Sequence, residues 1–369
     1  MNFLISVLSF IGVFSVLVFF HEMGHFSVAR LYGVRIDVFS IGFGPALWTR
    51  VDKKGTEWKI SAIPLGGYVK FFGDANEAST PSADMEGLTD EEKAVCFQFK
   101  PLVQRTLIVA AGPIANLVLA AVLMSAIFAV NGQSYTSPMV SRVLEESVAE
   151  QAGLESGDRI VAFNNFEVDT FEDIVSFVQT HGGQPVNIYY TRNDEVNLVS
   201  TTLGLREYTT PFGRVENIGL LGVMGAERVV VQRNPLEAIW YGTIETGDYI
   251  LLTLKSLKQF IYGQRSFKEL GGPLKIGEIS GEVAQSGISA LILFTALLSI
   301  NLGIINLFPI PMLDGGHLLF YAFEAIKKKP LNEKTQEYGF RVGVAAILTL
   351  MVVVTWNDVI SLIDRLGSP

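Results

Sequence analysis

The chain has 369 residues, of which 49% are hydrophobic, with a mean hydropathy of +0.36 and a net charge of −9. This composition favours a membrane protein over a set of water-soluble domains. An acidic chain whose longest basic run is residues 327–329 gives no indication of nucleic-acid binding. Because Cys96 is the only cysteine, disulfides within the chain and thiolate zinc clusters are both excluded.

Four segments contain no Asp, Glu, Lys or Arg, at residues 3–20, 106–130, 283–313 and 342–356. Since about 20 apolar residues cross a bilayer, we expect four transmembrane helices, the last of them completed by residues 338–341. The first segment has no basic leader and no small-residue cleavage site, and it runs directly into His21 and Glu22. We therefore expect it to be retained rather than removed as a signal peptide.

The distribution of lysine and arginine sets the expected orientation. The loops at residues 30–105 and 314–341 hold 10 and 5 basic residues, and the longer central loop at 131–282 holds 12. Because positive charge concentrates in cytoplasmic loops, both termini and the central loop should lie outside the cytoplasm. The expected layout is transmembrane helices at 1–30, 105–131, 283–313 and 337–357, cytoplasmic loops at 31–104 and 314–336, a folded domain at 136–231, an amphipathic linker at 232–282 and a tail at 358–369.

The first cytoplasmic loop has the pattern of β structure. Residues 34–72 alternate apolar and polar side chains between glycines, which is typical of short strands and hairpins. Two apolar stretches in it, residues 60–65 and 68–72, can lie at the bilayer edge only where protein or water satisfies their backbone groups. Residues 74–92 are acidic and rich in Ser and Thr, and we expect a loop there.

The central loop is expected to hold a small α+β domain. Thr170 with Asp173 predicts the start of an amphipathic helix, which Gly182 and Gly183 end. We expect strands at residues 139–143, 159–163, 186–190 and 196–203, and helices at 147–152 and 171–179.

Three short sequences in this domain resemble the signature of a PDZ domain: Ala152-Gly153-Leu154, Gly157-Asp158-Arg159-Ile160 and Asn164-Asn165. The resemblance implies one PDZ domain, without a second copy. After it, residues 235–262 have helical periodicity and several aromatic side chains. This segment is expected to lie on the outer membrane surface or to pack on the soluble domain.

The strongest chemical signal is His21-Glu22-Met23-Gly24-His25, an HExxH pattern. Positions i and i+4 share one face of a helix, so His21 and His25 can bind one zinc ion, with Glu22 beside them to accept a proton from water. Ionisable groups directly after an uncharged run are costly at membrane depth unless they serve a function. The alternative is a helix end whose polar side chains reach cytoplasmic water.

A catalytic zinc needs a third protein ligand and one open position. His181 lies in the domain expected outside the cytoplasm, whereas Asp314 and His317 follow the third apolar segment. In the four-span topology, the end of that segment and the end of the first lie on the same membrane face. The residues alone do not separate Asp314 from His317.

The segment Asn306-Leu307-Phe308-Pro309-Ile310-Pro311-Met312-Leu313-Asp314-Gly315-Gly316 resembles the NxxPxPxLDG motif of the site-2 protease family, peptidase family M50. The resemblance implies that Asp314 is the third zinc ligand. His317 is then either a neighbour of the site or a polar residue at the membrane surface. The two prolines should keep the approach to Asp314 extended.

The same resemblance marks Asn301 and Asn306. Their amides could donate to a developing oxyanion, or they could form hydrogen bonds between helices. Further segments extend the match: Ile41-Gly42-Phe43-Gly44-Pro45, Gly66-Gly67-Tyr68-Val69-Lys70 and Gly271-Gly272-Pro273. Together they resemble the bacterial RseP-like members of the family, although this chain has room for one PDZ domain rather than a tandem pair.

The implied fold is a polytopic α-helical membrane protein with about four transmembrane helices, a membrane-associated β region and one extracytoplasmic α+β PDZ domain, located in the bacterial inner membrane. The implied activity is that of a zinc-dependent intramembrane endopeptidase with Zn²⁺ as cofactor. Its substrates would be single-span membrane proteins that an upstream site-1 type protease has shortened, such as an anti-sigma factor or a signal-peptide remnant.

A substrate must be unwound before it is cut, and addition to a strand would hold it extended. Gly66, Gly67, Tyr68 and Val69 are the candidates for this strand. Two other classes stay open. One is a non-catalytic membrane adaptor that binds exported peptides through its PDZ domain. The other is a zinc transporter, for which the third span offers few polar residues.

Overall fold

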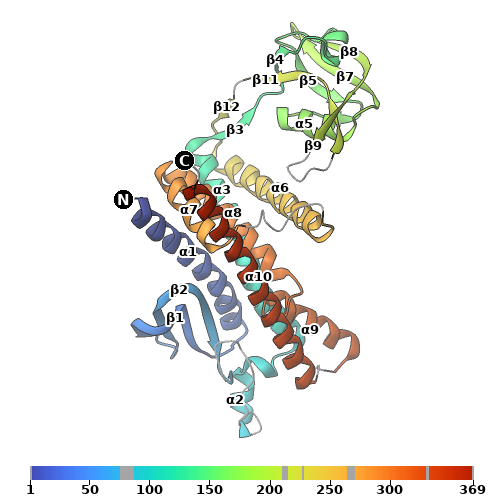
Figure 1. Ribbon diagram of the computed structural model, residues 1–369. Helices are drawn as coiled ribbons and strands as arrows, with labels where there is room; N and C mark the ends of the chain where they lie inside the picture. The colour runs from blue at the N-terminus through green and yellow to red at the C-terminus, as the bar shows by residue number, and fades with distance from the viewer. Residues whose placement is uncertain are drawn as a thin grey trace. The chain divides into compact units, whose positions relative to one another are not determined.

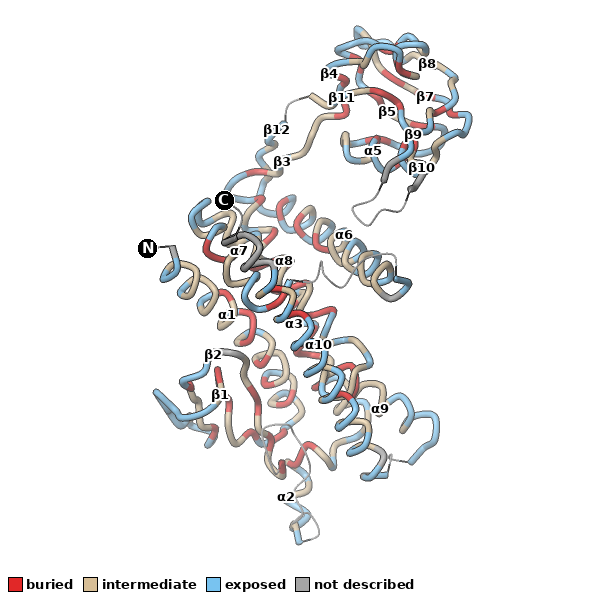
Figure 2. Tube along the Cα trace, viewed as in Figure 1, coloured by how far each residue is buried: buried red, intermediate tan, exposed pale blue. Residues whose placement is uncertain are grey.

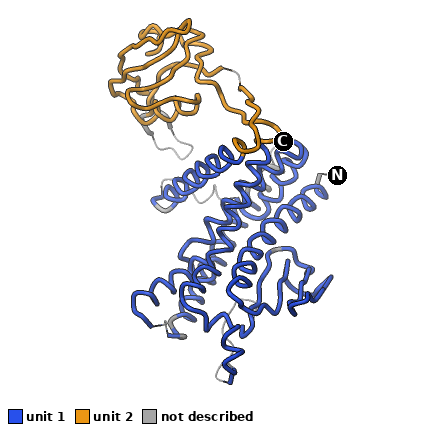
Figure 3. The backbone as a smooth tube through the Cα atoms, turned by 180° about the vertical axis from the view of Figure 1, so that it is seen from behind, with its two compact units in different colours: residues 1–127, 239–369 blue, residues 128–238 orange. Residues whose placement is uncertain are grey.

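The computed structural model describes residues 2–74, 87–209, 215–226, 228–263, 271–329 and 332–367. The chain forms two compact units, coloured separately in Figure 3. Met1–Ile127 and Ile239–Pro369 make up unit 1, which contains the long helices and one β region. Phe128–Ala238 makes up unit 2, which is rich in short strands.

In the described part of the chain, four helices are long and apolar enough to cross a membrane: α1 (Asn2–Leu31), α3 (Leu102–Asn131), α8 (Ile288–Leu307) and α10 (Glu333–Gly367). Two boundaries correct the predicted layout. The third span begins at Ile288 rather than at residue 283, because Gly287 has a φ of +114° and separates it from the preceding helix. α10 continues past the predicted end of the fourth span at residue 357, through the segment predicted as the tail, as far as Gly367.

Small residues let the long helices of unit 1 approach one another closely (Figure 1). Gly24 of α1 lies against the backbone of Ala111 in α3. Gly303 of α8 lies so near the carbonyl oxygen of Pro113 that a Cβ would stand 3.0 Å from it. Helices in lipid associate through such close packing rather than through hydrophobic exclusion. Two apolar clusters fill the contacts: Val13, Leu17 and Leu119, and Ala120, Met124, Ala296, Ile300 and Ile304.

Three further helices belong wholly or for most of their length to unit 1, namely α6 (Pro235–Ile261), α7 (Pro273–Gln285) and α9 (Asp314–Lys327). Gly242 of α6 contacts Ser125 of α3, and Tyr249 and Leu257 pack on the cluster around Ile300. The segment expected on the membrane surface or on the soluble domain therefore packs on two of the spanning helices. α7 runs along α1.

The β region consists of β1 (Ile36–Val51) and β2 (Glu57–Phe71), each long and bent rather than a set of short hairpins. Residues 57–60 pair with 48–51 on one side and with 38–41 on the other, and residues 38–41 pair in turn with 67–70. Two strands thus make four segments that lie side by side in one sheet, with residues 67–71 at one edge. Gly42, Gly44 and Gly66 have positive φ where the strands bend. Figure 1 shows this sheet beside the C-terminal half of α1.

The acidic segment at residues 74–92 falls largely outside the described residues, which resume at 87. Its end is helical rather than a loop. Thr89 caps α2 (Asp90–Val95), accepting a hydrogen bond from the Glu92 backbone N–H, while the Glu92 carboxylate accepts one from the Thr89 N–H at 2.9 Å. The short 3-10 helix Phe97–Phe99 then leads into α3.

Unit 2 is an α+β domain with a four-stranded sheet in the order β6 (Phe166–Glu167), β5 (Arg159–Phe163), β7 (Pro185–Arg192) and β8 (Glu195–Thr202). The predicted helices and strands are confirmed to within two residues, and Thr170 and Asp173 form the expected capping box. The strands at Gln133–Thr136 and Phe166–Glu167 and several short strands after residue 203 were not predicted. The elements are β3 (Gln133–Thr136), β4 (Val140–Val143), α4 (Val148–Gln151), β5 (Arg159–Phe163), β6 (Phe166–Glu167), α5 (Phe171–Thr180), β7 (Pro185–Arg192), β8 (Glu195–Thr202), β9 (Gly204–Thr209), β10 (Val215–Leu220), β11 (Val223–Gly225) and β12 (Arg228–Val231).

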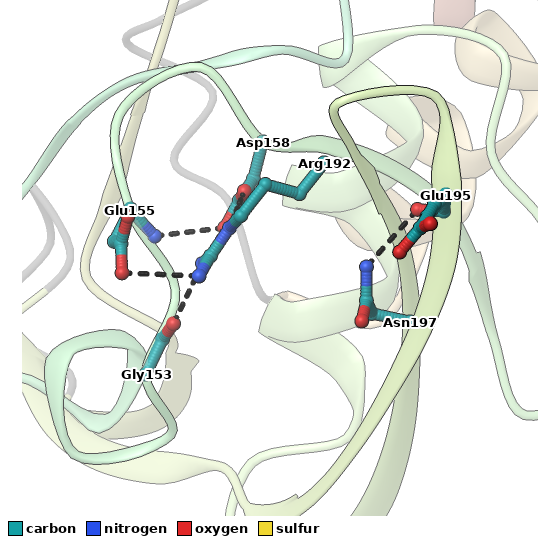
Figure 4. A network of polar contacts seen from close by, with 6 residues as sticks. All are labelled: Gly153, Glu155, Asp158, Arg192, Glu195 and Asn197. Atoms are coloured by element: carbon teal, nitrogen blue, oxygen red, sulfur yellow. Dashed lines mark hydrogen bonds and ion pairs between the residues drawn. The ribbon is translucent and has the colours of Figure 1, made fainter.

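One apolar core and one polar network stabilise unit 2. Figure 2 shows buried residues along β5 and β7, and these include Ile160, Phe163 and Ile188. At the end of β7, the guanidinium of Arg192 donates to both carboxylate oxygens of Asp158, at 2.7 and 2.8 Å (Figure 4). It also donates to the Gly153 carbonyl oxygen. Asp158 is only 1% exposed, so this bidentate pair compensates a buried charge.

Candidate metal centre

Three side chains from opposite ends of the sequence converge in unit 1. His21 and His25 lie one turn apart on α1, and Asp314 is the first residue of α9. The Nε2 atoms of the two histidines are 3.3 Å apart, and they lie 3.2 and 3.5 Å from Asp314 Oδ2. Among the described residues, this is the group whose ligand atoms could hold a metal ion. It is the set that the two sequence motifs predicted.

The extended approach to Asp314 has a local cause. α8 ends at Leu307, and Phe308 is already in extended conformation before Pro309 and Pro311, neither of which can donate a backbone hydrogen bond. Met312 has a φ of +92°, so the chain turns sharply just before α9 begins. Gly316 fits against the Ile310 carbonyl oxygen, where a Cβ would stand 2.5 Å from it. The tight turn therefore fixes the Asp314 carboxylate at the helix N-terminus.

Hydrogen bonding indicates that this cluster suits a cation. His25 Nδ1 is 2.9 Å from the Ile108 carbonyl oxygen, which can only accept, so Nδ1 carries the proton and Nε2 presents a lone pair. That lone pair faces Asp314 Oδ2, which is buried and accepts no hydrogen bond from the residues described. Two acceptors directed at one point repel each other unless a positive charge lies between them.

The spacing of the three ligand atoms fits zinc. Ligands at about 2.0–2.1 Å from a tetrahedral zinc ion lie roughly 3.3 Å from one another. The three separations in this cluster, 3.2, 3.3 and 3.5 Å, match that value. Two imidazoles and one carboxylate leave the fourth position for a reactant, which is the arrangement of catalytic rather than structural zinc.

Glu22 is buried beside the cluster, with 9% exposure, and faces the edge of the β region. A Cβ on Gly67 would stand 3.1 Å from Glu22 Cγ, and the backbone N–H of Val69 interacts with the Glu22 carboxylate. Tyr68 and Val69 are themselves buried. The structure thus brings Gly67 and Val69, two of the four residues predicted for substrate binding, next to the predicted general base.

The remaining predicted residues differ in their placement. Asn301 Oδ1 accepts a hydrogen bond from Thr253 Oγ1 of α6 at 3.4 Å, which is the helix-to-helix alternative. Asn306 lies half-buried in the last turn of α8, and His317 lies half-buried one turn after Asp314. His181 belongs to unit 2, where its ring stacks on Phe177.

Sequence reasoning missed two residues of α3 that contact the histidines. Asn116 is fully buried, and its Nδ2 is 3.2 Å from His21 Nδ1. Gly112 lies against the ring of His25. The signal for Asn116 was present, because a lone amide in an otherwise apolar span seeks a polar partner. Nothing local distinguished Gly112 from other glycines in the spans.

Long apolar helices around an HExxH sequence and a distant carboxylate define a membrane metalloprotease, and the comparisons with known proteins agree. The model of Peptidase family M50 matches residues 9–350. A protein of Agrobacterium fabrum named as a zinc metalloprotease is 42% identical over 362 residues, covering 97% of this chain and 96% of its own. Metalloprotease MmpA of Caulobacter vibrioides is 37% identical, with coverage of 97% and 96%.

The chain belongs to peptidase family M50, the site-2 protease family, and is a zinc metalloprotease. Among solved structures, the PDZ domain of an SdrC-like protein from Listeria monocytogenes is similar to part of it. The two are 17% identical, the match covers 25% of this chain and 88% of that one, and the TM-score is 0.20.

Proposed function

We propose that this protein is an intramembrane endopeptidase that cuts the transmembrane segments of single-span membrane proteins. The observation that carries the proposal is the juxtaposition of His21, His25 and Asp314 with a buried Glu22 and the edge segment of a β-sheet at residues 67–71. The first four provide the chemistry of peptide hydrolysis. The sheet edge provides a place for an unwound substrate.

The depth of the cluster supports cleavage within the membrane. Along α1, at 1.5 Å per residue, His21 lies about 28 Å from Asn2. The hydrocarbon core of a bilayer is about 30 Å thick, so a core that begins near Asn2 would end near the site. The basic loops favour the cytoplasm on that side, with the termini and unit 2 on the periplasmic side of an inner membrane.

In the proposed mechanism, His21, His25 and Asp314 hold zinc and Glu22 handles the proton. When bound, zinc would supply a Lewis acid that polarises the scissile carbonyl and lowers the pKa of water, so that the water can lose a proton and attack that carbonyl. The Glu22 carboxylate accepts the proton of the attacking water and returns it to the leaving amine. Its burial beside the Val69 backbone keeps it oriented toward the cluster.

The edge segment at residues 67–71 supports binding of an extended substrate. It pairs with residues 36–41 on one side, and its other side faces Glu22. A helical substrate has its carbonyl groups hydrogen-bonded, so a few residues must unwind before attack. Pairing with the sheet edge replaces the lost helical bonds and presents one peptide group to the site.

Unit 2 would select substrates outside the cytoplasm. Its sequence resembles a PDZ domain, a class of domain that binds peptides by strand addition. Single-span proteins shortened by an upstream site-1 type protease would expose a new terminus on that side. An anti-sigma factor or a signal-peptide remnant has this form.

The decisive experiment expresses the full chain with a panel of tagged single-span proteins and compares it with Glu22→Gln. The variant should keep zinc but leave every substrate uncut, because the amide cannot accept the proton. Unimpaired cleavage by Glu22→Gln would remove the mechanism. Capture of substrates by both forms, with cleavage by neither, would favour the alternative of a non-catalytic adaptor.

A further inference from the structure

Three residues of α3 at positions i, i+4 and i+8 face the histidines of α1. The carbonyl oxygen of Ile108 receives the Nδ1–H of His25, Gly112 leaves room for the His25 ring, and Asn116 meets Nδ1 of His21. α3 therefore contacts each imidazole at the nitrogen that points away from the ligand cluster. For His25 this contact already fixes the tautomer that a metal requires.

For His21 the contact requires a choice of amide orientation. As placed, Asn116 Nδ2 lies 3.2 Å from His21 Nδ1, while Oδ1 is buried and has no hydrogen-bond partner in the described ranges. If Nδ2 donates, Nδ1 accepts and the His21 proton resides on Nε2, where it blocks a metal. The oxygen and nitrogen of an amide have nearly the same shape, so only the hydrogen-bond network decides between them.

Exchanging the two amide atoms resolves the conflict at His21. Oδ1 then accepts a hydrogen bond from His21 Nδ1–H, and Nε2 presents its lone pair to the cluster. Among the described residues, one amide atom lacks a partner in either orientation, Oδ1 before the exchange and Nδ2 after it, so the tautomer that a metal requires decides between the two. The backbone at Asn116 is held as well, since Ser299 Oγ of α8 donates to its carbonyl oxygen at 2.7 Å.

We infer that Asn116 is a positioning residue for the metal: its amide oxygen accepts the Nδ1–H of His21 and holds the tautomer that can ligate zinc. The inference rests on the proposed function only in taking His21 as a ligand. Hydrogen-bond partners of metal-bound histidines typically change metal affinity by about 10- to 100-fold when they are removed. Asn116 should have an effect of this size although it touches no substrate.

The test measures zinc affinity of the full-length protein in detergent, by competition with a chromophoric chelator. Asn116→Leu keeps the volume but cannot accept a hydrogen bond, whereas Asn116→Asp keeps an acceptor at the same place. Asn301→Leu is the matched control, because Asn301 is also an intramembrane asparagine with a helix-to-helix hydrogen bond, but its partner is Thr253. Asp314→Ala reports separately on the ligand set.

We expect Asn116→Leu to bind zinc about 10- to 100-fold more weakly, and both Asn116→Asp and Asn301→Leu to stay close to wild type. Wild-type affinity in Asn116→Leu, or equal weakening in Asn116→Asp and Asn116→Leu, would overturn the inference. Undiminished affinity in Asp314→Ala would instead remove the proposed site, so the two failures are distinguishable.

A second measurement does not depend on how the variants fold. The chain has four histidines, so a ring-¹⁵N-labelled, zinc-loaded sample gives few imidazole signals. The inference predicts that His21 is protonated at Nδ1 and that this proton exchanges slowly with solvent. A His21 ring protonated at Nε2, or with a freely exchanging Nδ1 proton, contradicts it.

Discussion

Gly112 of α3 lies directly against the imidazole of His25, where a Cβ would stand 2.8 Å from ring atom Cδ2 and nearer still to Nε2. No methyl group fits there unless the ring moves. The position of one zinc ligand therefore depends on the absence of a side chain on a neighbouring helix.

Gly112→Ala should accordingly displace the His25 ring and weaken zinc binding by at least about tenfold. This is the size of effect seen in other metalloproteins when a residue that orients a metal ligand is changed. Gly12→Ala is the matched control, since nothing lies within 4 Å of a Cβ at that position of α1. It should bind zinc as wild type does. Equal zinc affinities for the two variants would contradict the assigned role of Gly112.

Asp314→Ala should abolish zinc binding, and His317→Gln should preserve it. Asp314 Oδ2 lies 3.2 Å from His21 Nε2 and 3.5 Å from His25 Nε2, whereas His317 is absent from the ligand group formed by described residues. Metal content of the purified variants, by elemental analysis, decides the matter. Loss of zinc in His317→Gln but not in Asp314→Ala would instead make His317 the third zinc ligand.

Zinc removal should be reversible in its effect on activity. A chelator should stop cleavage of a single-span substrate, and added Zn²⁺ should restore it, because the imidazoles and carboxylate are held by helix packing rather than by the metal alone. The unfolding temperature should fall on chelation, since a ligand that binds only the folded state stabilises it. An enzyme that stays fully active in excess chelator is incompatible with the proposed mechanism.

Val69→Pro should reduce cleavage strongly while leaving zinc content unchanged. Proline removes the backbone N–H that faces Glu22 and fixes φ, so the sheet edge can neither orient the general base nor pair fully with a substrate. Val69→Ala keeps the backbone and is the control. If the proline variant cut substrate as fast as the alanine variant, the edge segment at 67–71 would have no part in catalysis.

Arg192→Ala should destabilise unit 2, by less than the loss of a fully buried ion pair would, because the Arg192 side chain is 30% exposed. The cause is the Asp158 carboxylate, left buried without its partner (Figure 4). Hydrogen exchange of β5 and β7 in the full-length chain measures the change. Unaltered protection there would show that the ion pair adds nothing to stability.

The same pair predicts acid sensitivity of unit 2. Burial raises the pKa of Asp158, but hydrogen bonds from Arg192 and the Glu155 backbone outweigh it and hold the pKa below the usual value. A carboxyl with a depressed pKa in the folded state contributes stability that is complete above its unfolded pKa of about 3.9 and is lost as the pH falls further. Protection of β5 should therefore drop below about pH 4 in wild type and change less in Asp158→Asn.

Much of unit 1 was predictable because its signals are local. The uncharged runs predicted the transmembrane helices. HExxH and the LDG sequence predicted His21, His25 and Asp314, which the structure brings together. The limits of the third span depended on Gly287, whose positive φ no hydropathy pattern records. The pairing of residues 57–60 with two partners was not predictable either, because register between distant segments is set by packing rather than by composition.

The contribution of α3 to the metal centre shows the same limit more sharply. Asn116 and Gly112 act through contacts with residues about ninety positions away, and neither belongs to a chemical motif of its own. Similarly, α6 packs on α3 and α8 because Gly242 contacts Ser125 and Tyr249 packs on the cluster around Ile300. The helical periodicity of α6 does not identify these partners.

The two imidazoles and the carboxylate come from nearly opposite ends of the polypeptide, on α1 and at the start of α9. During synthesis, the ribosome delivers the histidines to the bilayer long before it has translated Asp314. A nascent chain therefore enters the bilayer with an incomplete ligand set. The metal centre can be completed only after Asp314 has been translated and the start of α9 has met α1.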